Sequence, residues 1–280
     1  MISEAEVQEL AESKNLITIG MKADEVRRRL HATRTSFVRV FEIHVDAPVS
    51  SLPPRTTAGE FRIVGAPKSL DAAGQAIASA KRVAGNIPVM GFSLADLSGV
   101  DGATSLATAC RAFRDAGLDG ISEVPLDGLD DPAVAIATAR EAGLFVGRLT
   151  VNAPVDEDRG QLARRARTLQ ESLGGFRAFA PLPRIVSVAS PTTGYDDVKQ
   201  IALARLIADN IDSIQVDWQL YGPKLAQFAL TVGADDVDGV AAVDPGTLGT
   251  RRSPIEEIRG NIRSAGLEPV ERNGRYEAIV

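Results

Sequence analysis

Three ionisable side chains alternate along one predicted strand in the first fifth of the chain. Glu42, His44 and Asp46 occupy every second position at the end of the apolar segment 37–45, so they share one face of a strand. An imidazole beside carboxylates can act as a general acid or base whose ring a carboxylate orients. The simpler alternative is a structural imidazole, hydrogen-bonded at a strand end, and the residues alone favour it.

A second candidate site is the glycine-rich loop before the last predicted helix. The segment 245–253, PGTLGTRRS, combines two glycines, two threonines and two arginines immediately before a helix start. Backbone N–H groups, the helix dipole and guanidinium groups would converge there on an anion. An ordinary solvated loop explains the same composition equally well. The residues of this candidate anion-binding loop are Gly246, Thr247, Gly249, Thr250, Arg251 and Arg252.

Polar side chains follow most of the other predicted strands as well. In a barrel of parallel strands these side chains meet at the carboxyl ends of the strands, where such barrels have their active sites. A set of mixed charge could hold a small charged molecule. The candidate substrate-binding residues are Arg148, Asn152, Arg184, Asp217 and Asp244. The further strand-end residues are Lys68, Ser93, Asp96, Glu123, Asp127, Thr150, Ser187, Gln219, Asp236 and Asp238.

Strands and helices alternate from residue 61 onward. The motifs DAGLDG, EAGLFV, LGGFRA, VGADDV and SAGLEP each read as helix, glycine, strand, at intervals of about 30 residues, which is the size of a βα unit. The clearest helix starts at Pro223 and stops at Gly233. This repetition predicts a TIM-type (β/α)8 barrel. A doubly wound open sheet is the alternative, but no GxGxxG or GxxxxGK(S/T) motif supports it.

The 280 residues are predicted to form a single barrel domain. A helical extension covers 1–33, the barrel strands and helices cover 34–252, and the last helix and tail cover 253–280. The proline-rich segment 48–59 has no helical period, so the first crossover helix is expected to be reduced or absent. We then expect an uncovered strand face near 61–64, which a partner or the N-terminal helix would cover.

Composition excludes several classes of partner. A net charge of −6 and a pI near 5.1 argue against nucleic-acid and membrane-surface binding, which need clustered positive charge. No apolar run is long enough to span a bilayer and the N-terminus is acidic, so a cytoplasmic protein is expected. The single cysteine, Cys110, falls on the inward stripe of a predicted helix, and no metal site is expected.

One long segment resembles a known enzyme group. Residues 209–239, DNIDSIQVDWQLYGPKLAQFALTVGADDVDG, resemble the C-terminal region of the aminofutalosine synthase and dehypoxanthine futalosine cyclase group and of the related deazaflavin synthase subunits. The resemblance covers most of residues 100–276. It implies a TIM-type barrel with a substrate pocket at the strand ends, and the radical S-adenosylmethionine chemistry of menaquinone biosynthesis.

The sequence departs from this group where the group binds its cofactors. The group holds a 4Fe–4S cluster on a CxxxCxxC motif in the loop after strand one, but the corresponding segment, 46–59, contains no cysteine. The Gly-Gly after strand two is Gly65-Ala66, and the glycine-rich loop after strand four is SEVP at 122–125. We therefore expect no cofactor: no iron–sulfur cluster, and no bound S-adenosylmethionine.

Two functions remain open. The first is a cluster-less relative that binds a small anionic or nucleoside-like metabolite in the barrel mouth, with non-radical lyase or transferase chemistry by His44, Glu42 and Asp46. The second is a catalytically inactive pseudoenzyme, the partner or regulatory subunit of an active homologue. A homo-oligomer and a hetero-oligomer with a cluster-bearing homologue are the two assemblies considered, and the sequence leaves the oligomeric state open.

Overall fold

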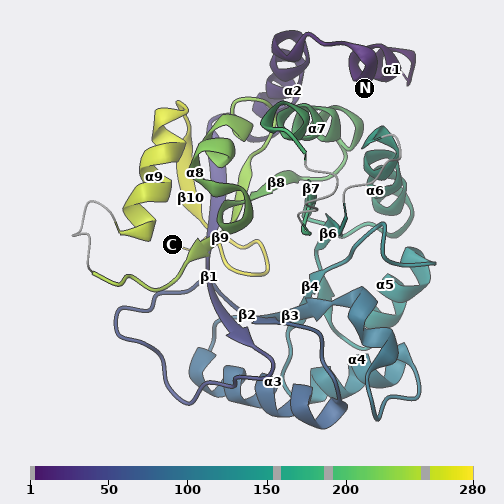
Figure 1. The fold of residues 1–280 in the computed structure, drawn as a ribbon, viewed down its shortest axis with the longest axis vertical. Helices are drawn as coiled ribbons and strands as arrows, with labels where there is room; N and C mark the ends of the chain where they lie inside the picture. Colours follow the sequence, from purple (N-terminus) through teal and green to yellow (C-terminus); the bar gives the residue numbers. More distant parts are fainter. Residues whose placement is uncertain (1–3, 154–158, 186–191, 247–252, 280) are drawn as a thin grey trace. The chain divides into compact units, whose positions relative to one another are not determined.

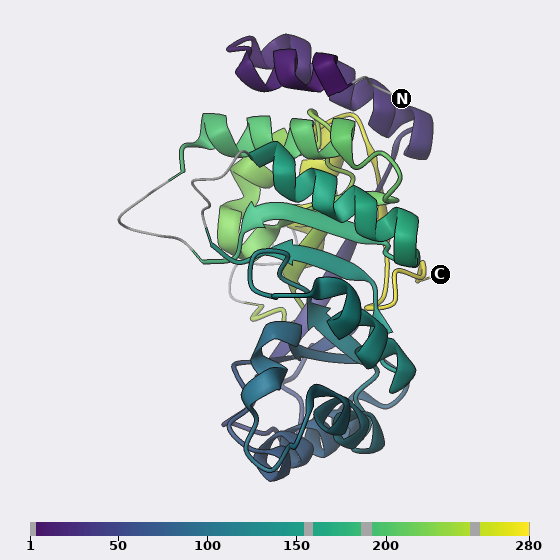
Figure 2. The same cartoon turned by 90° about the vertical axis from the view of Figure 1, so that its right-hand side faces the viewer.

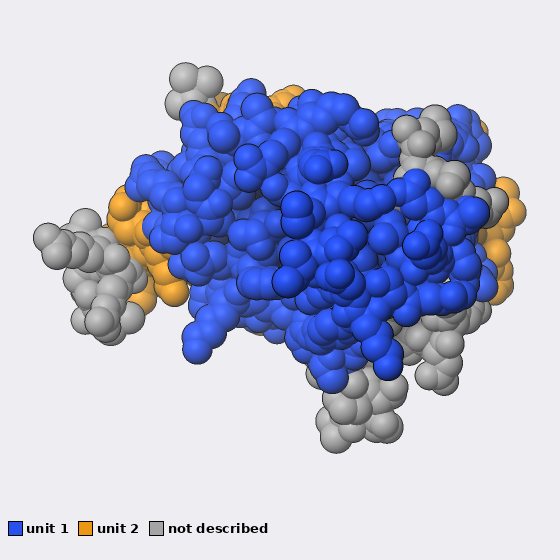
Figure 3. Space-filling view, turned by 90° about the horizontal axis from the view of Figure 1, so that it is seen from above, with its two compact units in different colours: residues 1–37, 149–238, 258–270 blue, residues 38–148, 239–257, 271–280 orange. Residues whose placement is uncertain are grey.

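The structure is a computed structural model, and it describes residues 4–153, 159–185, 192–246 and 253–279. The chain divides into two compact units, which Figure 3 shows in different colours. Unit 1 comprises residues 1–37, 149–238 and 258–270. Unit 2 comprises residues 38–148, 239–257 and 271–280. The predicted single-domain organisation remains a prediction.

In the described part of the chain, nine strands follow the order β5-β4-β3-β2-β1-β9-β8-β7-β6. The first and last strands of this order, β5 and β6, are consecutive in the chain. Helices alternate with the strands (Figure 1). The fold is therefore a nearly closed parallel barrel, and the predicted TIM-type fold is confirmed. β10 pairs with β1. The strands are β1 Arg34–His44, β2 Glu60–Val64, β3 Val89–Ser93, β4 Gly120–Glu123, β5 Phe145–Val146, β6 Arg148–Val151, β7 Ala178–Pro183, β8 Ser213–Asp217, β9 Asp236–Ala241 and β10 Glu268–Glu271.

The helices form where caps and apolar stripes predict them. For example, the Ser69 hydroxyl accepts a hydrogen bond from the backbone of Ala72 at the start of α3, which ends at Gly85, as a capped amphipathic helix should. In unit 1, α1 and α2 pack against α7 (Figure 2). The helices are α1 Glu4–Glu12, α2 Leu16–His31, α3 Leu70–Ala84, the short 3-10 helix η1 Leu94–Gly99, α4 Leu106–Asp115, α5 Pro132–Glu141, α6 Arg159–Leu173, α7 Gly194–Ile207, α8 Trp218–Ala229 and α9 Pro254–Ser264.

The connection between β1 and β2 contains no helix, as predicted. Residues 45–59 are all described and run as turns and extended chain. The expected uncovered strand face is absent from this part of the structure, because Phe61 and Ile63 are 0% and 1% exposed. Helix α3 packs on β2, and the Ser79 hydroxyl of that helix donates a hydrogen bond to the Val49 carbonyl. The prediction was wrong because the next helix, α3, covers the face.

Two segments differ from the predicted pattern. The strand that follows the glycine of the EAGLFV motif is broken at Gly147 into β5 and β6, where an added Cβ would lie 2.4 Å from the Phe145 ring. Helix α8 begins at Trp218, ahead of the predicted start, but Gly222 interrupts it with φ 74° and ψ 166°. The regular helix therefore does begin at Pro223, after one extra helical turn that the sequence pattern did not reveal.

No helix in the described part of the chain is both long enough and apolar enough to cross a bilayer.

Candidate functional site

The three ionisable residues of the first strand lie at the carboxyl end of β1 in unit 2. Glu42 and His44 face the solvent, and Glu42 pairs in register with Arg62 of β2. The Asp46 carboxylate accepts a hydrogen bond from the Lys68 ammonium at 2.8 Å. This hydrogen bond lowers the pKa of Asp46 below its ordinary value. The structure thus brings Asp46 and Lys68 together as an exposed ion pair.

The backbone, and not a carboxylate, orients the His44 ring. The backbone N–H of Asp46 donates to His44 Nδ1 at 3.2 Å. With Nδ1 accepting, a neutral imidazole carries its proton on Nε2. In this arrangement His44 can donate a hydrogen bond through Nε2, and to accept a proton at Nδ1 it must first release the Asp46 N–H. Whether these residues are catalytic stays a prediction.

A second acidic group lies at the carboxyl ends of β3 and β4, also in unit 2. Glu123 ends β4 and pairs in register with Ser93, the last residue of β3. Asp96 follows three residues later on η1. Partial burial, together with the charge of Glu123, raises the pKa of Asp96 above its ordinary value. Because the Asp96 side chain remains exposed, solvent screens both effects and the shift is modest.

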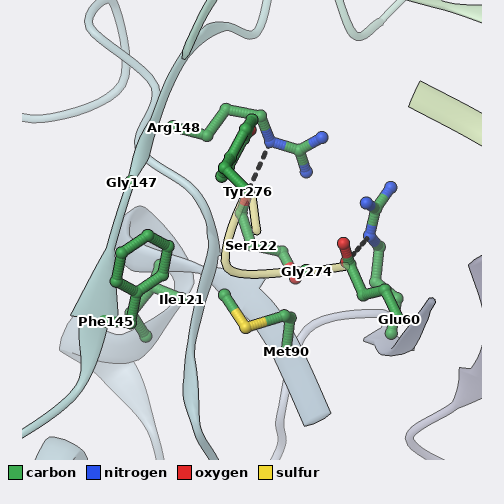
Figure 4. Close-up of a pocket in the computed structure, with 10 residues that line it drawn as sticks. Glu60, Met90, Ile121, Ser122, Phe145, Gly147, Arg148, Gly274 and Tyr276 are labelled. Carbon is green, nitrogen blue, oxygen red and sulfur yellow. Dashed lines mark hydrogen bonds and ion pairs between the residues drawn. The ribbon is translucent and has the colours of Figure 1, made fainter. Parts of the chain in front are cut away.

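Arg148 is buried in unit 2 and lies close to Glu123, one of these two carboxylates. Its side chain is 4% exposed, and its Nη2 lies 3.9 Å from Glu123 Oε1. Its Nε donates to the Ser122 carbonyl at 2.7 Å, the bond drawn in Figure 4. A buried guanidinium fixed in this way is a ready partner for an anionic group of a ligand.

Backbone strain occurs beside the same pair. Phe92, in β3, has φ 63°. This left-handed backbone conformation costs free energy for any residue other than glycine, and especially for a bulky one. Its ring packs against Phe113 of α4, with the centroids 5.1 Å apart. The left-handed turn interrupts the alternation of β3 immediately before Ser93 and η1. Strain of this kind is frequent at functional sites because it re-aims the chain.

A narrow cleft, here called the inner cleft, lies below Arg148 (Figure 4). It leaves room for about one water molecule. Within it Glu60 Oε1 accepts from Arg62 Nε at 2.6 Å, and both side chains are buried. The Ser122 hydroxyl is buried and has no hydrogen-bond partner among the described residues. The lining residues are Glu60, Arg62, Met90, Ile121, Ser122, Phe145, Gly147, Arg148, Gly274 and Tyr276.

The C-terminal segment contributes to this cleft, which the sequence did not reveal. Gly274 donates its backbone N–H to the Gly59 carbonyl at 3.1 Å. Arg275 Nη2 donates to Asp119 Oδ1 at 2.8 Å. The Arg272 guanidinium stacks on the Tyr276 ring, 4.0 Å from its centroid. No periodic sequence pattern predicts such a segment, because it contacts residues that are distant in the sequence.

In unit 1 the structure brings together two of the predicted substrate-binding residues. Arg184 Nη1 donates to Asp217 Oδ2 at 2.6 Å. The other oxygen of Asp217 accepts from the Leu220 N–H at 2.9 Å and so caps α8. Asn152 follows β6, and its carbonyl accepts the Ile185 N–H at 2.7 Å. Asp217 therefore has a structural role in addition to any ligand it binds.

Most of the predicted anion-binding loop lies outside the described residues, namely Thr247, Gly249, Thr250, Arg251 and Arg252. The strand-end residue Ser187 lies outside them as well. Gly246 is described, and its N–H donates to Asp244 Oδ1 at 2.8 Å. Elsewhere in the described chain, no group of three or more His, Cys, Asp or Glu side chains is placed to hold a metal ion.

Comparison with known proteins supports the resemblance found in the sequence. Residues 177–279 match the family model described as the CofH/MqnC C-terminal region. Aminodeoxyfutalosine synthase of Streptomyces coelicolor is 33% identical over 164 residues, which cover 50% of this chain and 42% of that protein. Cyclic dehypoxanthine futalosine synthase of the same organism is 29% identical over 205 residues, covering 63% and 50%. The chain thus spans about half the length of these curated relatives.

Solved structures show the same fold. Methylornithine synthase matches with a TM-score of 0.66 and 14% identity, covering 96% of this chain and 94% of that one. The FeFe-hydrogenase maturase HydG of Carboxydothermus hydrogenoformans matches with a TM-score of 0.65 and 12% identity, covering 99% and 77%. At such identities the likeness concerns the fold alone.

These comparisons contradict our expectation that no cofactor is involved. The relatives and the structural neighbours are radical S-adenosylmethionine enzymes, which use an iron–sulfur cluster and S-adenosylmethionine. Departures at three sequence motifs were therefore insufficient ground for that expectation. The donor set of this chain is a separate observation: Cys110 is its single cysteine and is 0% exposed within α4. Burial raises the pKa of its thiol to about 11, so this residue does not fit a cluster ligand.

Proposed function

We propose that the strand ends of unit 2 bind a small anionic or nucleoside-like metabolite and perform acid–base chemistry on it. One observation carries the proposal: Asp96 and Glu123 follow or end β3 and β4 at their carboxyl ends, and Glu123 Oε1 lies 3.9 Å from Nη2 of the buried Arg148. This is the end at which barrels of this type have their active sites.

The two carboxylates have unequal environments. The pKa of Asp96 is raised, whereas Glu123 lies 3.9 Å from the buried Arg148 guanidinium. Carboxyl groups in such different surroundings divide into an acid and a base. Asp96 is thus the proposed proton donor and Glu123 the proposed acceptor. Its accessibility to solvent lets Asp96 reach a substrate.

Arg148 is the proposed anchor for the negative charge of the ligand. Its Nε is held by the Ser122 carbonyl, which fixes the plane of the guanidinium. The resemblance to futalosine-route enzymes supports a nucleoside or an enolpyruvyl-type acid as the ligand class. Glu42, His44 and Asp46, at the end of β1 in the same unit, are proposed to contribute further proton transfer.

A ligand screen with matched variants tests this proposal. Isothermal titration calorimetry would measure binding of futalosine-type nucleosides, chorismate-derived acids and inorganic phosphate to the intact chain. Glu123→Gln keeps the volume of the side chain and should weaken binding of the best ligand at least tenfold. Asp130→Asn, in an exposed loop of the same unit, should leave it unchanged. Binding that survives Glu123→Gln and Asp96→Asn unaltered would place the ligand elsewhere and refute the proposal.

A partner or regulatory subunit is the second candidate function. It is supported by the burial of the only thiol of this chain, because an active relative would then have to supply the cysteine ligands of a cluster. Co-purification from the native host with a cysteine-bearing homologue is the expected result for this candidate. A chain that elutes alone from the native host at its monomer mass contradicts it.

A further inference from the structure

A second pocket lies in unit 2, and it shares no lining residue with the inner cleft. Its cavity volume is about 260 Å³, slightly below the range of roughly 300 to 1,000 Å³ typical of ligand pockets, so its occupant must be small. We call it the α9 pocket. Its lining residues are Arg39, Arg55, Thr57, Ala241, Ala242, Asp244, Pro254 and Ile255.

The α9 pocket exists because the β1–β2 connection contains no helix. The extended segment instead pairs with the chain that follows β9, through an antiparallel bridge between Thr56 and Val243. The Thr57 N–H donates to the Ala242 carbonyl at 2.9 Å. These contacts place the side chains of Arg55 and Thr57 beside residues 241–244 and the first turn of α9.

Arg55 is held in an unusual backbone conformation with an uncommitted side chain. Its φ is 60°, a left-handed value that costs about 1 kcal/mol or more outside glycine. Its guanidinium lies against Gly246, where an added Cβ would be 2.1 Å from Nη1. In the described chain, no hydrogen bond or ion pair engages this guanidinium. The left-handed backbone of Arg55 and its contact with Gly246 therefore hold an uncommitted guanidinium at the pocket.

The opposite charge comes from Asp244. Its Oδ1 accepts the Gly246 N–H, and its other oxygen takes part in no hydrogen bond between described residues. The second arginine of the pocket is already paired, since Arg39 Nε donates to Glu271 Oε1 at 2.7 Å. The uncommitted charges of the pocket are thus one guanidinium and one carboxylate oxygen.

This pair of charges selects the class of ligand. A simple anion at Arg55 would meet the Asp244 carboxylate, and a simple cation at Asp244 would meet the guanidinium, so each is opposed by a like charge. A molecule with both charges satisfies both groups at once. The remaining lining, Ala241, Ala242, Pro254 and Ile255, offers apolar contact to a short side chain.

We propose that the α9 pocket binds a small zwitterion of the α-amino-acid class, with its carboxylate on Arg55 and its ammonium group on Asp244. The site is distinct from the acid–base site proposed above. A molecule bound here contacts the β1–β2 connection and the start of α9 together.

Calorimetry on the intact chain tests the inference, with glycine, L-alanine and L-leucine as probes. We expect at least one to bind. The amide of that amino acid lacks the carboxylate and its N-acetyl form lacks the ammonium group, so each should bind at least tenfold more weakly. Arg55→Met and Asp244→Asn should each weaken binding of the free amino acid at least tenfold. Arg82→Met, at an exposed arginine of α3 in the same unit, is the matched control and should change nothing.

Failure of all three amino acids to bind would overturn the inference. So would inorganic phosphate that binds more tightly after Asp244→Asn, because that result describes a simple anion site. Should a charge variant unfold, Gly246→Ala is the second probe: its Cβ displaces Arg55 and should weaken amino-acid binding while the circular dichroism spectrum stays native. Asp96→Asn should leave amino-acid binding unchanged, which separates this site from the acid–base site.

Discussion

The Nε2 atom of His31, at the end of α2, lies 3.0 Å from the Oδ2 atom of Asp235, just before β9. The hydrogen bond to Asp235 raises the pKa of His31, against the opposing effect of burial. Asp235 is buried, which alone would raise its pKa, but the Arg205 charge and the His31 hydrogen bond hold that pKa below its ordinary value. This pair joins the N-terminal helices to the strands of unit 1.

The pair predicts a loss of stability with rising pH. Because the folded-state pKa of His31 is raised, its contribution is complete below the unfolded value of about 6.5 and is lost as the pH rises through the folded value. His31→Gln should remove that pH-dependent part, on the order of 1 kcal/mol. Urea unfolding between pH 6 and 9 measures it. His44→Gln, at the exposed second histidine, is the control, and an unchanged pH profile in His31→Gln would contradict the prediction.

Replacing Arg205 should cost more stability than replacing His31. Its guanidinium is 0% exposed, and its donors bind the carbonyls of Gly233 and Ile211 as well as the Asp235 carboxylate. Arg205→Met leaves a buried carboxylate without its main cation and should lower the free energy of unfolding by about 3 to 5 kcal/mol. The double variant Arg205→Met, Asp235→Asn should recover part of that loss. Exposed Arg111→Met serves as the control by urea unfolding, and a loss of the same size in that variant would contradict this account.

The barrel could be predicted from the sequence because its signals are local. Each helix–glycine–strand junction is readable within a few residues, and the regular part of α8 was expected to begin at Pro223, as it does. A missing helical period also sufficed to predict that the β1–β2 connection contains no helix.

The sites could be predicted only in part, because side-chain partners are set by distant segments. Asp96 and Glu123 were recognisable as strand-end residues, but their mutual effect depends on the register between β3 and β4. The partner of His44 Nδ1 is a backbone N–H, which the alternation of the strand residues could not distinguish from a carboxylate. The path of the Arg55 backbone through a left-handed conformation has no signature in its neighbours.

At two glycines of unit 2 we expect substitution by alanine to change the stability of the protein in opposite directions. At Gly120 an added Cβ would lie 2.5 Å from the Phe145 carbonyl and 2.6 Å from Met90 Cε, beside the inner cleft. Gly120→Ala should therefore destabilise the protein by about 1 to 3 kcal/mol. Gly74, inside α3, has no atom within 4 Å of the added Cβ, so Gly74→Ala should stabilise it by about 0.5 to 1 kcal/mol. Thermal unfolding of both variants checks the signs, and a stabilised Gly120→Ala would show that β4 and β5 are less tightly paired than described.

Asp96 provides a test of whether the acid–base site is maintained at the expense of stability. Its folded-state pKa is raised, so its ionisation opposes folding: stability is complete below the unfolded value of about 3.9 and falls as the pH rises through the folded value. Asp96→Asn should therefore be slightly more stable than the parent at pH 7, by about 0.5 kcal/mol or less because the group is exposed. The difference should vanish at pH 3. Asp130→Asn is the matched control, and urea midpoints at the two pH values give the comparison. A variant that gains stability and loses ligand binding indicates a carboxyl retained for function, whereas a variant less stable than the parent at pH 7 would mean that Asp96 is a structural residue.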